Sequence, residues 1–155
     1  MTEPTQSTTG KPRIVVGVDG SPGSKNAVRW AARMATMTGA RLDVVAAWQY
    51  SALLGFNLLP EFEFPGSDIE RSLEETVDEV LGAERPADLR VKALRGSAAE
   101  TLIAAGKGAL MIVVGSRGHG GFTGLLLGSV SALVAEHADC PVLVVHGEGP
   151  PPAIA

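Results

Sequence analysis

The chain has little cysteine, no long hydrophobic run and no excess of positive charge, and each absence excludes a class of protein. A single cysteine among 155 residues, Cys140, excludes an internal disulfide framework and fits a reducing compartment. No apolar run reaches the roughly 18 residues of a membrane-spanning helix, so we expect no membrane partner. A formal net charge of −4, without a basic cluster, argues against nucleic acid as the main partner. The N-terminal residues also lack the apolar segment of a secretory signal, so we expect a cytoplasmic protein.

The composition and length predict one folded domain with a polar tail at each end. Hydrophobic residues make up 45% of the chain and charged residues 19%, which is ordinary for a globular protein. Residues 1–12 are polar and residues 147–155 are rich in proline and glycine, so we expect both to be disordered. The domain is therefore predicted to span residues 13–146, which is long enough to bury a core.

Short apolar runs alternate with helical patterns along this domain. We expect strands over 13–18, 42–48, 88–94, 110–114 and 141–145, and helices over 22–38, 67–82, 97–106 and 129–137. Capping-box patterns at 67–70 and 97–100 and an N-cap serine, Ser21, favour the helix starts. This alternation predicts an α/β fold: an open five-stranded parallel sheet with helices on both faces, in the flavodoxin-like order 3-2-1-4-5.

Glycine is concentrated after the fourth predicted strand. Six of the nineteen glycines fall between Gly115 and Gly128, in a loop that leads from the strand into the last helix. Glycine lets the main chain approach a ligand closely, and the amides of such a loop and of the following helix can face an anion. This pattern indicates a phosphate-binding loop.

Neither of the two commonest phosphate-binding motifs accounts for this loop. A Walker A motif needs a lysine, and no lysine follows Lys107. The dinucleotide pattern G-x-G-x-x-G also fails, because Thr123 stands where its third glycine would be. What is present is Gly115-x2-Gly118-x9-Gly128-Ser129, together with IVVGVDGS at the first strand and PVLVV at the last.

These motifs resemble the universal stress protein family in its ATP-binding branch, over roughly Arg13 to His146. The resemblance implies a bound ATP, with any Mg²⁺ held mostly by phosphate oxygens and water rather than directly by the protein. The implied roles are shared among strand ends, the glycine loop and the last helix. They fall to Asp19 near adenine and ribose, Ala47 at the adenine edge, Gly115 and Gly118 along ribose and phosphates, and Gly128, Ser129, Val130 and Ser131 at the phosphates. Arg117 is a further candidate from its place in the glycine loop.

Each assignment has a simpler alternative. Asp19 can cap the first helix or its loop, and Ser129 is as expected for an N-cap as for a phosphate ligand. Arg117 and His119 can contact phosphate or lie in solvent, and Gly120, Gly121 and Gly124 can serve only to make the loop flexible. A metal site from His137, Cys140 and His146 is disfavoured, because no fourth ligand is near. The loop over 49–66 can be functional or a surface insertion.

The resemblance therefore implies an ATP-binding regulatory protein of the stress-response type, and we expect no catalytic residues. Nucleotide occupancy would modulate dimer or partner interactions, and the resemblance implies a homodimer along the last strand, Val142–Val145. Two alternatives stay open: a slow ATP hydrolase, and a protein for another adenine nucleotide such as cyclic AMP. Phosphoryl transfer needs a positioned charge-stabilising group, and the loop offers only Arg117 and His119 for that role.

Overall fold

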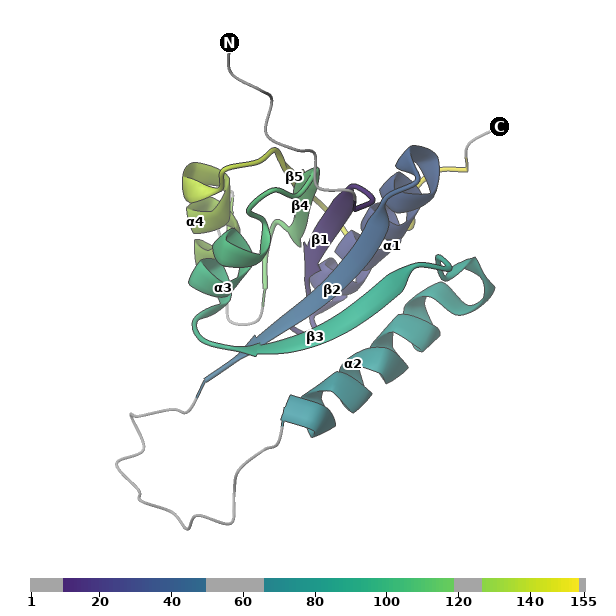
Figure 1. The fold of residues 1–155 in the computed structure, drawn as a ribbon, viewed down its shortest axis with the longest axis horizontal. Helices are drawn as coiled ribbons and strands as arrows, with labels where there is room; N and C mark the ends of the chain where they lie inside the picture. Colours follow the sequence, from purple (N-terminus) through teal and green to yellow (C-terminus); the bar gives the residue numbers. More distant parts are fainter. Residues whose placement is uncertain (1–9, 50–65, 119–126, 154–155) are drawn as a thin grey trace.

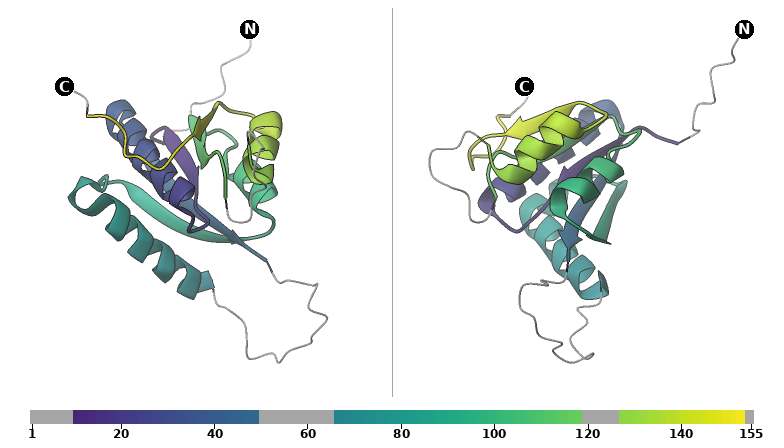
Figure 2. Two further views of the ribbon diagram at one scale, coloured as in Figure 1. Left: turned by 180° about the vertical axis from the view of Figure 1, so that it is seen from behind. Right: turned by 90° about the vertical axis from the view of Figure 1, so that its left-hand side faces the viewer.

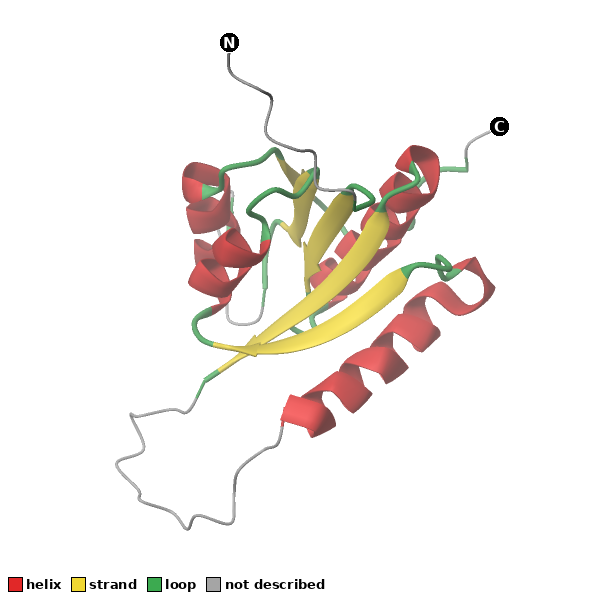
Figure 3. Cartoon of the chain, in the orientation of Figure 1, coloured by secondary structure: helices red, strands yellow, loops and turns green. Residues whose placement is uncertain are grey.

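The computed structural model of the chain describes residues 10–49, 66–118 and 127–153, in which strands and α-helices alternate (Figures 1 and 3). The strands are β1 (Arg13–Gly17), β2 (Arg41–Trp48), β3 (Leu89–Arg95), β4 (Met111–Gly115) and β5 (Val142–Val145). The helices are α1 (Pro22–Thr38), α2 (Gly66–Leu81), α3 (Ala98–Ala105) and α4 (Ser129–His137), with a short 3-10 helix, η2 (Gly82–Glu84), after α2. Each expected strand and helix is present, with ends that shift by at most one residue.

The five strands form one parallel sheet in the order β3-β2-β1-β4-β5, which confirms the predicted topology. β1 is central and pairs with β2 from Arg13↔Arg41 to Gly17↔Val45. On its other side β1 pairs with β4, where Val16 is opposite Val113. The chain builds outward from β1 to β3 and then returns to β4, so the order reverses beside β1. Ligands of open α/β sheets bind at the carboxyl ends of the strands at such a reversal.

Helices cover both faces of the sheet, α1 and α2 on one and α3 and α4 on the other (Figure 2). Successive residues of β1 point to opposite faces, as in any strand. Ile14 and Val16 therefore pack with Val28 of α1, whereas Val15 belongs to the core under α3 and α4 with Leu102 and Val134. In the described ranges, no helix is both long enough and apolar enough to cross a membrane.

The helix ends follow the expected local chemistry at α1 and α3 but not at α2. The Ser21 hydroxyl accepts a hydrogen bond from the Ser24 amide at 3.2 Å, and Ser97 accepts from the Glu100 amide at 3.4 Å. The capping box expected over 67–70 is wrong in position, because α2 already begins at Gly66. Its carboxylate has another contact: Glu70 accepts a bond from the Ala93 amide of β3 at 3.4 Å.

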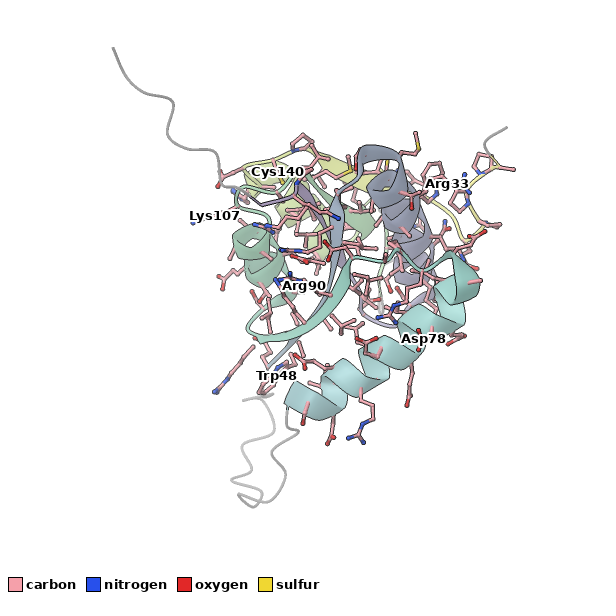
Figure 4. The ribbon with its side chains drawn as sticks, turned by 45° about the vertical axis from the view of Figure 1, so that its right-hand side comes forward. Arg33, Trp48, Asp78, Arg90, Lys107 and Cys140 are labelled. Atoms are coloured by element: carbon pink, nitrogen blue, oxygen red, sulfur yellow. The ribbon has the colours of Figure 1, made fainter. Side chains whose placement is uncertain are left out.

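The first residues beyond β5, for which we expect a disordered tail, contact helix α1. The Asn26 side-chain amide, in a residue that is only 1% exposed, donates a 3.0 Å hydrogen bond to the Gly147 carbonyl. Further along α1, the Arg33 side chain donates a hydrogen bond to the Pro152 carbonyl. Figure 4 shows Arg33 beside the C-terminal segment. Residues 147–152 thus lie along α1, held by side chains that composition alone does not connect to them.

A buried carboxylate lies in β2 near the amino ends of the strands. Asp43 is 1% exposed, and Arg41 donates two hydrogen bonds to it, at 2.8 and 3.0 Å. Lys92 of β3 adds a 3.3 Å contact and Arg13 of β1 lies 3.9 Å away. Burial alone would raise the pKa of Asp43, but the Arg41 hydrogen bonds and the Lys92 charge outweigh it and lower that pKa below its usual value.

Candidate functional site

The candidate site is a cavity of about 530 Å³ at the carboxyl edge of the sheet. The loop after β1, the ends of β2 and β4, and the starts of α3 and α4 line it. All nine residues that the sequence singles out line this cavity: Asp19, Ala47, Gly115, Arg117, Gly118, Gly128, Ser129, Val130 and Ser131. The structure therefore brings the two motif halves, which are about a hundred residues apart in the chain, to one place. Which ligand these residues contact stays a prediction.

The adjacency of β1 and β4 explains this convergence. Gly17 ends β1 and Gly115 ends β4, so the segments that follow both strands begin side by side at one edge of the sheet. The Gly128 amide donates a 2.7 Å bond to the Ser116 carbonyl, which draws the start of α4 onto the end of β4. The glycine loop between them, residues 119–126, lies outside the described residues, and with it His119, Gly120, Gly121 and Gly124.

Close approach of main chain, rather than positive φ, is the reason for two of the motif glycines. A Cβ atom at Gly118 would lie 2.4 Å from an Asp19 carboxylate oxygen, and one at Gly115 would lie 2.9 Å from the Gly23 main chain. Neither glycine has a positive φ. Gly128 is different, because a Cβ there would meet nothing nearer than 3.5 Å. Packing within the protein therefore does not require a glycine at this position of the cavity wall.

Asp19 both orders its loop and faces the cavity. One carboxylate oxygen accepts a 2.9 Å bond from the Ser21 amide, so the capping role left open by the sequence is present. The other oxygen is the one that approaches Gly118. The Asp19 amide donates to the Ser24 hydroxyl at 3.3 Å, which ties this loop to the first turn of α1. The carboxylate is therefore held in a fixed place on the cavity wall.

The N-terminus of α4 has no side-chain cap. Its N-cap residue is Gly128, whereas α1 and α3 have Ser21 and Ser97 with hydroxyls bound to first-turn amides. The first amides of a helix have no carbonyl partner within it, and they carry partial positive charge. No acidic residue lies in this first turn. The amides of Ser129, Val130 and Ser131 thus lie beside the cavity at a helix end of the kind that can bind an anion.

The Ser131 hydroxyl has a structural partner, in contrast to the expected contact with phosphate. It donates toward the Ser116 carbonyl at 3.1 Å and the Gly128 carbonyl at 3.0 Å, and the residue is 3% exposed. A hydroxyl has a single proton to donate, and these carbonyls take it. Ser131 can therefore serve an anion through its amide, while its side chain joins α4 to β4. Ser129, by contrast, is exposed.

The main-chain N–H and C=O groups of Ala47 lie beyond the last residue pair of β1 and β2. In a parallel ladder, alternate residues turn their N–H and C=O groups toward the same neighbouring strand. The Val45 carbonyl accepts from the Val18 amide at 2.9 Å on the β1 side, and the Trp48 carbonyl accepts from the Gly96 amide at 2.8 Å on the β3 side. Ala47 has the parity of Val45, but the β1–β2 pairing ends at Gly17↔Val45. One donor and one acceptor therefore face the cavity region.

The sequence did not identify the apolar wall of the cavity. Ala98 and Leu102 of α3 line it together with Val45 and Val114 of the sheet. Leu102 is 4% exposed and comes so close to Gly17 that a Cβ there would lie 2.7 Å from it. The spacing of Ala98 and Leu102 is that of an ordinary core-facing helix, so no signal in the sequence separated them from core residues. Val18, Ser24, Leu127 and Ala132 also line the cavity and were not identified from the sequence.

The charged groups of the lining are few. Among the described residues that line the cavity, only Asp19 and Arg117 carry a formal charge. In the same described part of the chain, no group of three or more His, Cys, Asp or Glu side chains is placed to hold a metal ion. The arrangement is suited to binding by main-chain groups and apolar contact.

Comparison with known proteins gives the family. The model of the universal stress protein family matches residues 12–146. A universal stress protein of Mycolicibacterium smegmatis is 37% identical over 87% of this chain, and one of Mycobacterium tuberculosis is 36% identical over 87%. The chain spans only 48% of the length of each of these two relatives.

Solved structures agree with this assignment. A universal stress protein from Lactobacillus plantarum, 21% identical, has the same fold with a TM-score of 0.70 over 89% of this chain and 99% of its own. A universal stress protein in complex with cAMP is 27% identical, with a TM-score of 0.62 over 89% of this chain and 98% of its own. A third, from Archaeoglobus fulgidus in complex with dAMP, is 21% identical, with a TM-score of 0.59 over 88% and 98%. The match of the family model over residues 12–146 shows that the chain belongs to the universal stress protein family.

Proposed function

We propose that this protein binds an adenine nucleotide, ATP by preference, in the 530 Å³ cavity, and that occupancy regulates its association with itself or with a partner. One observation carries the proposal: an uncapped helix N-terminus, a fixed carboxylate and an apolar slot meet around one cavity. The volume lies within the range of about 300–1,000 Å³ that is typical of small-molecule sites. Such a combination offers a separate place for the phosphates, the ribose and the base of a nucleotide.

The apolar end of the cavity suits the base. Val45, Ala98 and Leu102 provide aliphatic contact for a flat ring. The Ala47 amide and carbonyl supply one donor and one acceptor on the same edge. Adenine presents an acceptor and an amino donor side by side and can pair with both groups, whereas guanine presents its donor and acceptor in the opposite order. This contrast supports adenine as the base.

The other end suits phosphate. The amides at the start of α4 and the backbone at Gly118 and Gly128 provide donors and room, and Arg117 adds the cation. A Mg²⁺ ion would be held by phosphate oxygens and water, in the way Mg²⁺ usually binds nucleotides. The two solved relatives described as complexes with cAMP and dAMP support the adenine class, and cAMP is the alternative ligand.

Catalysis is not part of the proposal. Phosphoryl transfer needs several positioned groups around the γ-phosphate, and Asp19 and Arg117 are the charged groups that line the described cavity. We expect any ATP hydrolysis to be slower than about one turnover per minute, which corresponds to a barrier of about 20 kcal/mol or more.

Regulation would pass through β4 to the last strand. β5 is an edge strand with the sequence VLVV, and it pairs with β4 up to Gly115↔Val145, directly at the cavity. An apolar edge strand is a pairing surface unless it is covered. We propose a cytoplasmic homodimer along Val142–Val145 whose stability depends on the nucleotide. Sedimentation velocity with and without ATP measures this dependence.

The direct test is to release and weigh the nucleotide that co-purifies with the protein, and to titrate the nucleotide-free protein with ATP, cAMP and GTP by calorimetry. We expect an adenine nucleotide in the released fraction and an ATP affinity at least tenfold higher than that for GTP. A protein that retains no nucleotide and binds none of the three would overturn the proposal. A clear preference for cAMP over ATP would instead establish the alternative.

A further inference from the structure

A second cavity, of about 420 Å³, adjoins the first at the same edge of the sheet. The two share Arg117 and Gly118 and no other lining residue. The other walls of the second cavity come from Ser21 and the first residues of α1, from Ser116 after β4, and from the residues that follow β5, among them His146 and Glu148. The chemistry proposed above for ATP uses none of these walls.

The second cavity differs in character from the first. Its lining includes two buried serines, Ser21 and Ser116, and the exposed residues His146 and Glu148. The negative charge of Glu148 offsets the positive charge of Arg117, so the cavity does not favour a bare phosphate. An imidazole can stack on a nucleobase, and a carboxylate can accept hydrogen bonds from ribose hydroxyls. These groups suit an uncharged polar ligand with an aromatic ring, which describes a nucleoside.

Arg117 and Gly118, which line both cavities, are also the residues beside which we place the phosphate chain. Gly118 belongs to both linings and presents main chain rather than a side chain. Gly23 approaches the same segment so closely that a Cβ on it would lie 3.0 Å from the Arg117 carbonyl oxygen. Because Gly23 packs against this main chain, Arg117 and Gly118 form a wall that the two cavities share, and a phosphate chain that runs along this wall from the first cavity can extend to the second.

We propose that the ligand class of this site is an adenine nucleotide whose phosphate chain carries a second nucleoside: a dinucleoside polyphosphate. One adenosine occupies the first cavity, the phosphates pass Arg117 and Gly118, and the second nucleoside lies against His146 and Glu148. The inference rests on the proposed function, because it takes the first adenosine and the phosphates from it. It adds the second cavity as a binding site.

The test compares ATP with diadenosine tri-, tetra- and pentaphosphate by calorimetry on the full chain in one Mg²⁺ buffer. The tetraphosphate is the key probe, because it carries the same formal charge as ATP and differs by the second adenosine. We expect at least one of the three to bind about tenfold more tightly than ATP, which is about 1.4 kcal/mol, with one ligand per chain. His146→Ala and Glu148→Ala should each reduce this advantage severalfold and leave ATP affinity unchanged.

His137→Ala is the matched control, because His137 is an exposed histidine on α4 that lines neither cavity. It should change neither affinity. ATP binding without any gain from the second adenosine would overturn this inference and leave the proposed function standing. A gain that survives both His146→Ala and Glu148→Ala, or one ligand shared by two chains, would place the second nucleoside elsewhere and also overturn it. Failure to bind any adenine compound would overturn both.

Discussion

The Gly128→Ala substitution separates the binding role of the glycine motif from its packing role. The added Cβ would have its nearest protein neighbour 3.5 Å away, an ordinary contact, and the backbone at φ −68° and ψ 165° is open to alanine. Replacing an N-cap glycine by alanine costs about 1 kcal/mol at most, or about 2–4 °C in melting temperature for a domain of this size. The fold should therefore survive. The methyl group, however, stands on the cavity wall where we place the phosphates, and ATP affinity should fall at least tenfold.

The assay is calorimetric titration with ATP beside a thermal melt of each protein. Gly149→Ala is the matched control, since a Cβ at Gly149 meets nothing within 4 Å and the residue lines neither cavity. Gly115→Ala is a poor reporter, because its Cβ would press on the Gly23 main chain at 2.9 Å and disturb the fold. If Gly128→Ala melts like the parent protein and binds ATP with unchanged affinity, the phosphates do not lie where we place them.

Three further changes test the surrounding structure. Asp43→Asn should cost about 3 kcal/mol above pH 5, because it breaks the buried contact with Arg41. Since folding lowers the pKa of Asp43, its stabilisation is complete above the unfolded value of about 4 and is lost as the pH falls through the folded value. Urea melts should thus show the gap between the two proteins narrowing as the pH falls below about 4, and a gap that widens in acid would contradict this. Burial raises the pKa of the Cys140 thiol, so iodoacetamide at pH 8 should alkylate Cys140 more slowly than it alkylates the thiol of free glutathione. Mass spectrometry measures both rates, and an equal or faster rate at Cys140 would refute the assignment. Ser131→Ala should lower stability by about 1 kcal/mol in a denaturant melt and weaken ATP binding severalfold, because it frees the start of α4 from the Ser116 carbonyl; unchanged values for both would exclude the tether.

Much of the fold follows from local patterns in the sequence. Runs such as Ile14–Val16 and Ile112–Val114 are apolar on both sides because both faces of the sheet are covered, and this alone indicates a parallel sheet. Ser21 and Ser97 mark helix starts because their hydroxyls satisfy first-turn amides. At α2 the same pattern was misleading, because the helix begins one residue earlier and Glu70 bonds to β3.

The site was predictable only as far as its chemistry lies in the main chain. The glycine spacing and the Asp19 loop were singled out because together they resemble the motif of the universal stress protein family, and the structure places both on one cavity. The apolar wall from Ala98 and Leu102 does not, because a helix that covers a cavity and one that covers a core use the same side chains. The partner of the Ser131 hydroxyl was also out of reach, since Ser116 comes next to it only through the fold.

The hydrogen bonds between α1 and the C-terminal segment are a third feature that only the structure reveals. Proline and glycine after Val145 suggest a chain without structure, yet Asn26 and Arg33 bind carbonyls of that segment from α1. An asparagine on a helix is normally assigned to the surface, whereas Asn26 is buried. This segment also brings His146 and Glu148 to the second cavity, so the position of a tail contributes to a candidate site.

The central claim is that main-chain amides just after β4 and at the start of α4 bind the phosphates of an adenine nucleotide. A titration of ¹⁵N-labelled protein with ATP, followed by amide chemical shifts, observes these groups one by one. We expect the largest shifts at the amides of Gly118, Ser129 and Val130, with a second group of shifts around Ala47. The account would be contradicted if saturating ATP left the chemical shifts of these amides unchanged. It would also be contradicted if ATP changed only the shifts of residues in α2 or around Asp43.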